Sequence, residues 1–359
     1  GIHILSYLLE KTTNKVYCLI RKDPSTSIKD KILSKLHFYF GNKYDSLIGT
    51  RIIIINSDLT ENDLGISESN KKLLINNVSC VINSAALVKH YGTYKDFQEI
   101  NVLTVQKLIN FCENYNKRLI QISTISVSGN TLTDLAVNKN NFDEDIIFSE
   151  RDLFINQSLE NVYVHSKFEA EKLILEEVFH NKLNALILRV GNITNRLSDG
   201  KFQQNTMENA FANRLRAFLL LKQIPEYLLK NYIEFTPVDT VAEAIVKSIQ
   251  YQQKGLSVLH LYNSNHVYIK DFVKAIPTDY SLKIVSHEDF KKTLNNALND
   301  AQKQYVVSHL LNDLDSQKKL IYDAHIKIDN TFSLAYLLKF KFKWPNIDKR
   351  YIENLLKNI

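Results

Sequence analysis

Short, continuously apolar segments alternate with helix-patterned segments along the first half of the chain. We interpret five of the apolar segments as strands, at residues 16–20, 51–55, 80–85, 119–122 and 185–190. Between them, apolar residues recur at helical spacing, notably at 2–11, 28–40 and 97–115. Continuously apolar strands separated by helices are typical of a parallel sheet with helices on both faces. Because such crossovers are right-handed, the pattern predicts an α/β fold with a doubly wound, parallel Rossmann-type sheet, which binds ligands at the carboxyl ends of its strands.

The alternation weakens after residue 190. A loop rich in Gln and Asn at 200–205 precedes a predicted helix at 208–221. A strand at 232–236 and a helix at 238–251 then return towards the sheet, and the pattern from residue 264 onward is mostly helical, ending with a helix at 347–359. We therefore expect a nucleotide-binding domain at 1–190 and a smaller, mostly helical substrate lobe at 191–359, from which about 232–262 return to the sheet.

Charge and composition argue against several classes of protein. The formal charge is +6, but the basic residues are spread along the chain instead of forming the patch that nucleic-acid binding requires. No segment approaches the ~20 apolar residues of a membrane span. Cys18, Cys80 and Cys112 lie far apart in apolar stretches, which favours buried thiols in a reducing compartment over a disulfide or a metal site. We expect a cytoplasmic protein that binds no metal, nucleic acid or membrane.

A dinucleotide site is predicted along the carboxyl edge of the sheet, although the chain lacks the usual glycine-rich motif. That motif joins the first strand to the first helix, whose N-terminus holds the pyrophosphate. We interpret Gly1, just ahead of the helix at 2–11, as the last glycine of such a turn, with the first strand and the other glycines upstream in a longer polypeptide. About 20 residues further on, where an arginine accommodates the 2′-phosphate of NADPH, the chain has Arg21 and Lys22. This favours NADPH over NADH.

Other expected cofactor contacts lie at the ends of the following strands. Asp58 and Leu59 are expected to contact the adenine, and the small residues Ala85 and Ala86 would let the cofactor approach the backbone. The complete set of expected cofactor-binding residues is Gly1, Arg21, Lys22, Asp58, Leu59, Ser84, Ala85, Ala86, Ser123, Tyr163, Lys167, Gly191, Asn192 and Ile193.

Tyr163 and Lys167 lie four residues apart on one face of a predicted helix, after the strand that ends in Ser123 and Thr124. The same spacing occurs at 7 and 11, 39 and 43, and 91 and 95, but none of those pairs follows such a strand and opens a long helix. Because an ammonium group favours a neighbouring phenolate, we expect the pKa of Tyr163 to fall from about 10 towards neutrality. In a hydride-transfer enzyme, Tyr163 would donate a proton to the substrate oxygen, Thr124 would be a second donor to that oxygen, and Lys167 would bind the nicotinamide ribose hydroxyls. His165 points away from this face and is expected at the surface or in the layer of residues behind the site.

Taken in order, these motifs resemble the thioester reductase domains at the ends of nonribosomal peptide synthetases and the related domain of carboxylic acid reductases. Both belong to the extended short-chain dehydrogenase/reductase superfamily. The matching stretches are 16–21, 58–60, 83–92, 122–129, 161–167 and 189–193, with 236–239 and 344–345 in the smaller lobe. Within them, Lys89 and His90 border the expected cleft.

This resemblance implies NADPH-dependent reductive release. An acyl or peptidyl chain arrives as a thioester on the phosphopantetheine arm of a carrier domain, expected upstream in the same polypeptide. It leaves as an aldehyde, which some members of the family reduce again to an alcohol.

Two other functions remain open from the residues alone. A nucleotide-sugar epimerase or dehydratase uses the same three catalytic residue types, but it would usually carry contacts for a nucleotide diphosphate that we cannot locate in this sequence. A non-catalytic NADP-sensing regulator needs the cofactor edge without a hydroxyl, a phenol and an ammonium group. The presence of Thr124, Tyr163 and Lys167 together favours an enzyme over such a regulator.

Overall fold

The computed structural model describes residues 1–88, 92–129, 131–133, 146–250, 257–311, 314, 319–320 and 326–359. The first elements are α1 (Ile2–Lys11), β1 (Val16–Ile20), α2 (Ile28–Phe40), β2 (Ile52–Asn56) and α3 (Glu68–Asn77). Strands β1 and β2 pair in parallel, with Val16 opposite Ile52. Helix α2 begins after Ser27, whose side chain accepts a hydrogen bond from the Asp30 backbone. Leucine and isoleucine side chains of α1, α2 and β2 form a small core in this part of the chain.

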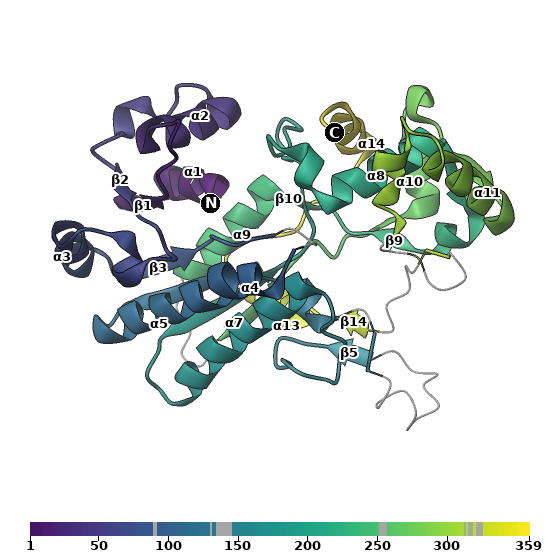
Figure 1. The fold of residues 1–359 in the computed structure, drawn as a ribbon. Coiled ribbons are helices and arrows are strands. Elements are labelled where there is room, and N and C mark those ends of the chain that lie inside the picture. The colour runs from purple at the N-terminus through teal and green to yellow at the C-terminus, as the bar shows by residue number, and fades with distance from the viewer. Residues whose placement is uncertain are drawn as a thin grey trace.

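Four further strands form the central sheet. They are β3 (Cys80–Asn83), β4 (Arg118–Thr124), β6 (Ala185–Val190) and β11 (Val258–Leu261). All run parallel, in the order β11-β6-β4-β3. Helices α5 (Thr104–Asn114) and α7 (Val162–Phe179) cover one face, whereas α1, α9 (Val238–Gln250) and α13 (Thr331–Leu338) pack on the other (Figure 1). Helices on both faces of parallel strands confirm the predicted doubly wound α/β fold.

The sheet is interrupted between β1 and β3. Among the described residues, β1 pairs only with β2 and β3 pairs only with β4, so β1 and β3 each have an edge without a strand partner. The side chains of β1 are all half-buried, as are most of those of β3, although both strands are apolar; β6 in contrast is buried throughout. Such half-exposed apolar strands with an open edge can pair with a further strand.

The helix expected at 97–115 is composite. It consists of α4 (Tyr94–Phe97), the π-helical turn η3 (Gln98–Leu103) and α5. A π-helical turn widens the helix and is often found at functional sites. In this turn Asn101 and Val102 are buried, whereas Leu103 is 48% exposed, so the apolar periodicity of the sequence did not locate the turn.

Much of the chain after residue 209 forms a second packed group. Helices α8 (Ala210–Leu221), α10 (Ile269–Ala275), α11 (His287–Leu298), α12 (Gln304–Ser308) and α14 (Lys349–Lys357) pack around Phe218, Phe272 and Phe290, at the right in Figure 1. Strands β8 (Gln223–Pro225) and β13 (Lys283–Val285) pair in parallel beside them. Elsewhere, β5 (Ile146–Phe148) and β14 (Ile326–Ile328) also form a parallel pair. In the part of the chain that the structure describes, no helix combines the length and hydropathy of a membrane span.

One predicted strand was wrong. The segment 232–236 divides into β9 (Tyr232–Ile233) and β10 (Thr236–Pro237), which have different partners. Strand β9 pairs antiparallel with β12 (Val267–Tyr268), whereas β10 pairs in parallel with β7 (Ile193–Thr194). The division falls at Glu234, whose buried carboxylate accepts hydrogen bonds from the Asn192 backbone (2.7 Å) and from the Thr236 hydroxyl.

Candidate active site

One face of α7 lies against the carboxyl end of β4. Tyr163, Lys167 and Glu171 follow each other at four-residue spacing, so their side chains share this face. The helix begins after Asn161, whose side chain accepts hydrogen bonds from the Tyr163 backbone (3.0 Å) and the Val164 backbone (3.2 Å). This cap fixes the first turn of the helix, and with it the position of Tyr163.

The structure brings together the phenol of Tyr163 and the hydroxyl of Thr124, which form a side-chain hydrogen bond. Burial raises the pKa of Tyr163 to about 12, and the hydrogen bond with Thr124 lowers it in part. The expected fall of the Tyr163 pKa towards neutrality was therefore wrong for this structure, because desolvation of the phenolate is the largest effect on the phenol. At neutral pH the phenol is protonated and has a proton to donate.

The Lys167 ammonium lies one turn further along α7 and donates to the Ile122 carbonyl over 2.7 Å. The side chain is buried. Burial lowers the pKa of Lys167 to about 8, and the nearby Glu171 carboxylate raises it in part. Lys167 therefore remains largely charged at neutral pH, close to the end of β4 that carries Thr124.

Behind these residues lies a buried polar chain that the sequence did not indicate. The Ser123 hydroxyl donates to one carboxylate oxygen of Glu171. The other oxygen accepts from Arg189, from Nε over 2.9 Å and from Nη2 over 2.8 Å. Arg189 also contacts His260, with 3.0 Å between Nη1 and Nε2. Glu171, Arg189 and His260 are fully buried.

A second residue missed from sequence is Asn101, in the π-helical turn. Its side-chain amide donates to the Leu87 carbonyl (3.0 Å) and to the Ser166 hydroxyl (2.9 Å), and its oxygen accepts from the Leu87 backbone (2.8 Å). Asn101 thereby ties the segment after β3 to the helix turn between Tyr163 and Lys167. The only signal in the sequence was an asparagine at a buried helical position.

The expected cofactor residues lie at the ends of several strands. A side chain added at Gly1 would meet Ser84 Oγ at 3.1 Å, so these two expected contacts are neighbours. Arg21 and Lys22 are exposed after β1. Asp58 accepts from the Thr60 backbone (3.0 Å) and hydroxyl (2.7 Å), and these hydrogen bonds lower its pKa.

The small residues after β3 leave room near the backbone. Ser84 and Ala85 are exposed, Ala86 is half-buried, and the Ala85 backbone donates to the side chain of Asn83 over 3.1 Å. Leu59 is half-buried and packs beside the core of α5. Lys89 and His90 lie outside the described residues.

At the end of β6, Gly191 is packed tightly. A side chain there would meet Tyr262 Cβ at 2.5 Å and Glu234 Oε1 at 2.6 Å. Burial raises the pKa of Glu234 to about 7, although its hydrogen bonds with Asn192 and Thr236 lower it in part. Ile193, two residues after Gly191, is exposed. Glu234 therefore fixes the backbone of the expected cofactor loop, a role that sequence reasoning missed.

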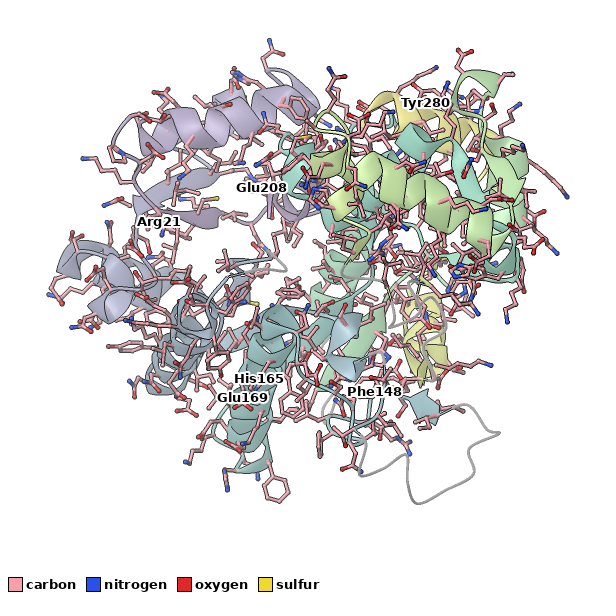
Figure 2. The ribbon with its side chains drawn as sticks, turned by 45° about the vertical axis from the view of Figure 1, so that its right-hand side comes forward. Arg21, Phe148, His165, Glu169, Glu208 and Tyr280 are labelled. Carbon is pink, nitrogen blue, oxygen red and sulfur yellow. The ribbon has the colours of Figure 1, made fainter. Side chains whose placement is uncertain are left out.

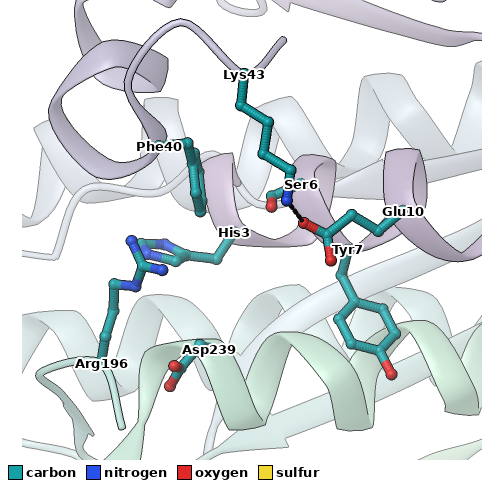
Figure 3. Close-up of a pocket in the computed structure, with 8 residues that line it drawn as sticks. All are labelled: His3, Ser6, Tyr7, Glu10, Phe40, Lys43, Arg196 and Asp239. Carbon is teal, nitrogen blue, oxygen red and sulfur yellow. Dashed lines mark hydrogen bonds and ion pairs between the residues drawn. The ribbon is translucent and has the colours of Figure 1, made fainter. Parts of the chain in front are cut away.

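Two other features lie apart from this group. Figure 2 shows His165 and Glu169 side by side on α7, where their side chains are partly exposed and approach within 3.8 Å. A cavity of about 160 Å³ lies between α1, the end of α2 and the start of α9 (Figure 3). Its lining residues are His3, Ser6, Tyr7, Glu10, Phe40, Lys43, Arg196 and Asp239. None of them is an expected site residue, and the cavity does not contain the Tyr163 and Thr124 pair.

Comparison with known proteins identifies the family. The family model described as "Male sterility protein", an NAD-binding domain, matches residues 1–245. A thiolation-reductase di-domain from an archaeal non-ribosomal peptide synthetase has a TM-score of 0.83 and 30% identity, covering 100% of this chain and 72% of its own.

Curated relatives are much longer than this chain. Probable polyketide synthase 6 of Dictyostelium discoideum is 23% identical over 305 residues, which are 83% of this chain but 10% of the synthase. L-2-aminoadipate reductase of Saccharomyces cerevisiae is 24% identical over 87% of this chain and 22% of the enzyme. The chain thus spans about a tenth to a fifth of the length of these two relatives. The chain belongs to the male sterility protein family of NAD(P)-binding oxidoreductase domains, and it is similar to a reductase domain of a non-ribosomal peptide synthetase.

Proposed function

We propose that the domain uses NADPH to reduce a thioester-linked acyl or peptidyl chain, carried on the phosphopantetheine arm of a carrier domain in the same polypeptide, to an aldehyde. The observation that carries the proposal is the hydrogen bond between Tyr163 and Thr124, beside the buried Lys167. The archaeal relative, which joins a thiolation domain to a reductase domain, supports the carrier as partner.

The residues at the strand ends suit a dinucleotide. Arg21 and Lys22 would hold the 2′-phosphate, and Asp58 and Leu59 would lie at the adenine. The remaining proposed contacts follow the course of the bound molecule: Gly1, Ser84, Ala85 and Ala86 at the pyrophosphate, Lys167 at the nicotinamide ribose, and Tyr163, Gly191, Asn192 and Ile193 at the nicotinamide end, where Ser123 would take part through its backbone because its hydroxyl donates to Glu171. The exposure of Arg21, Lys22, Ser84 and Ala85 leaves these positions accessible to a ligand. When bound, the nicotinamide supplies the hydride.

In the proposed reaction, hydride adds to the thioester carbonyl carbon, and the carbonyl oxygen gains negative charge. Tyr163 donates its phenolic proton to that oxygen, and Thr124 donates a hydrogen bond to it; one such donor typically lowers the barrier by about 3–4 kcal/mol. The product of this step is a hemithioacetal. Its hydroxyl returns the proton to Tyr163 as the C–S bond breaks, which leaves the aldehyde. The departing thiolate takes a proton from water, so one proton is consumed overall.

The high pKa of Tyr163 is consistent with this direction of reaction. A phenol with a pKa of about 12 is protonated at neutral pH, as a proton donor in a reduction must be. The charged Lys167 beside it would stabilise the phenolate that forms when the proton leaves.

The test uses the protein as it is naturally encoded, with an acyl-pantetheine thioester as substrate. We expect NADPH absorbance to fall in step with the release of free thiol, and Tyr163→Phe to lower the rate at least a hundredfold. Tyr7→Phe is a matched control, because Tyr7 also precedes a lysine by four residues but lies on α1. Equal rates for Tyr163→Phe and the parent, or thiol release without NADPH oxidation, would overturn the proposal.

A further inference from the structure

Three consecutive turns of α7 contact three consecutive residues of β4. Tyr163 bonds the Thr124 hydroxyl, Lys167 bonds the Ile122 carbonyl, and Glu171 accepts from the Ser123 hydroxyl. Tyr163 and Lys167 have roles in the proposed reaction, but Glu171 has none, because both of its carboxylate oxygens bond Ser123 and Arg189. Its carboxylate is fully buried, which requires a reason, because burying a charge is costly unless it is paired.

The pairing of Glu171 extends across three strands of the sheet, β4, β6 and β11. Arg189 of β6 holds one of its oxygens through two hydrogen bonds, and His260 of β11 contacts Arg189 in turn. His260 Nδ1 lies 2.6 Å from the Asp329 carbonyl, so this nitrogen carries the proton and Nε2 is free to accept from Arg189. Burial and the charge of Arg189 lower the pKa of His260 to about 4, in agreement with a neutral ring.

An aromatic ring closes this chain on one side. Phe148 of β5 stacks parallel to His260, with 5.9 Å between ring centroids, and the Arg189 guanidinium lies 4.9 Å from the same ring. The partners of each hydrogen bond are far apart in sequence: 48 residues separate Ser123 from Glu171, and 71 separate Arg189 from His260. The chain therefore joins α7, β4, β6, β11 and the segment after β14 at one level of the sheet.

We infer that Glu171 is a positioning residue for the proposed reaction: held by Arg189 and His260, its carboxylate locks the helix that carries Tyr163 and Lys167 onto the strand end that carries Thr124, and it is the counter-charge of Lys167. This inference rests on the proposed function for its catalytic meaning. Such a pair costs desolvation that an apolar pair of similar size would avoid, so its presence here is explained by geometry and charge at the site.

The groups around Lys167 show which of them acts on the charge of its ammonium group. Tyr163 and Glu171 lie one turn before and one turn after Lys167 on α7, and the neutral Ile122 carbonyl accepts its hydrogen bond from β4. Arg189 of β6 and the neutral His260 of β11 lie behind Glu171. Glu171 raises the pKa of Lys167 against the effect of burial. Removing its negative charge must therefore lower the pH at which Lys167 loses its proton.

Two variants separate charge from geometry. Glu171→Gln keeps the shape and removes the charge, whereas Ser123→Ala keeps the ion pair and removes the bond to β4. Ser248→Ala is the matched control, because Ser248 is also buried but its hydroxyl bonds only the Ala244 carbonyl within α9. We would follow the titration of Lys167 by NMR of isotopically labelled lysine, without substrate, and measure kcat and KM with the acyl-pantetheine thioester.

We expect Glu171→Gln to move the Lys167 titration at least about one pH unit below that of the parent, as loss of a nearby opposite charge does. Ser123→Ala should lower kcat by roughly tenfold or more with little change in KM, because the bond it removes is to a charged group. Ser248→Ala should change neither. An unchanged Lys167 titration in Glu171→Gln, or an unchanged kcat in Ser123→Ala, would overturn the inference. A parent protein that oxidises no NADPH would instead overturn the proposed function, and the NMR titration would still decide whether Glu171 is the counter-charge of Lys167.

Discussion

Replacing Lys167 by methionine is expected to stabilise the fold while it removes activity. Lys167 is buried, yet it is charged at neutral pH. Methionine has a similar length and fills the same space without an ammonium group to desolvate. If Lys167 is retained for chemistry and not for packing, the protein without it must be more stable.

The size of the effect follows from the pKa of Lys167. Its change from the ordinary value of 10.5 to about 8 corresponds to roughly 3 kcal/mol of unfavourable burial. Against this, the variant loses the hydrogen bond to the Ile122 carbonyl, which contributes about 1 kcal/mol. That carbonyl still accepts from the Gln121 side chain over 3.1 Å. We therefore expect the variant to be about 2 kcal/mol more stable at pH 7.

The pH dependence of unfolding is a second, independent check on this stability difference. Below about pH 8, Lys167 is protonated in both the folded and the unfolded state. Between about 8 and 10.5 only the unfolded state keeps this proton, so the stability of the parent rises with pH over this interval. The variant lacks this contribution, and its advantage should shrink as the pH rises through 8.

Urea unfolding between pH 7 and pH 10 tests both points. Trp344 is the single tryptophan and lies buried against the core of the sheet, so its fluorescence reports the unfolding of this region. Lys172→Met, on the exposed side of the same helix, is the control and should give no comparable gain. A Lys167→Met protein less stable than its parent at pH 7, or an advantage that does not change with pH, would refute the reasoning.

Three further changes have defined outcomes. Arg21→Ala should weaken NADPH binding far more than NADH binding in fluorescence titrations, and an equal loss for both would contradict contact with the 2′-phosphate. Gly191→Ala should lower the free energy of unfolding by about 1–3 kcal/mol, because the added methyl would stand 2.5 Å from Tyr262 Cβ; unchanged urea unfolding would contradict this packing. Burial raises the pKa of Glu234 from 4.5 to about 7, so the folded state holds more protons between these values and stability should fall as the pH rises through them. Glu234→Gln should abolish this part of the slope, and a parent and variant with equal slopes would show that Glu234 does not titrate there.

The elements that the sequence predicted best are those whose pattern is local. The bounds of α1, β1, α2 and β6 agree with expectation, since their apolar periodicity follows directly from burial on one or both faces. The prediction for 232–236 failed because its middle residue, Glu234, points into a buried site, where its carboxylate accepts from the distant Asn192 backbone as well as from Thr236. A short apolar run does not reveal which strand it will pair with.

In the candidate site, too, features with a local sequence pattern were predicted and features that depend on distant residues were not. The order of Thr124, Tyr163 and Lys167 along the chain was enough to expect them at one sheet edge, since parallel strands end together. Glu171 follows Lys167 at the next four-residue step, but its partners Ser123 and Arg189, and the contact of Arg189 with His260, are identified only by tertiary structure. The direction of the Tyr163 pKa was wrong for a related reason: the sequence shows the neighbouring charge, but not how deeply the phenol is buried.

The interrupted sheet has a practical consequence for handling the protein. The open sides of β1 and β3 present rows of backbone amides and carbonyls next to apolar side chains, and such surfaces are templates for strands of other molecules. Such open edges make the protein prone to self-association. A short β-forming peptide supplied in trans would pair with such an edge and compete with that self-association.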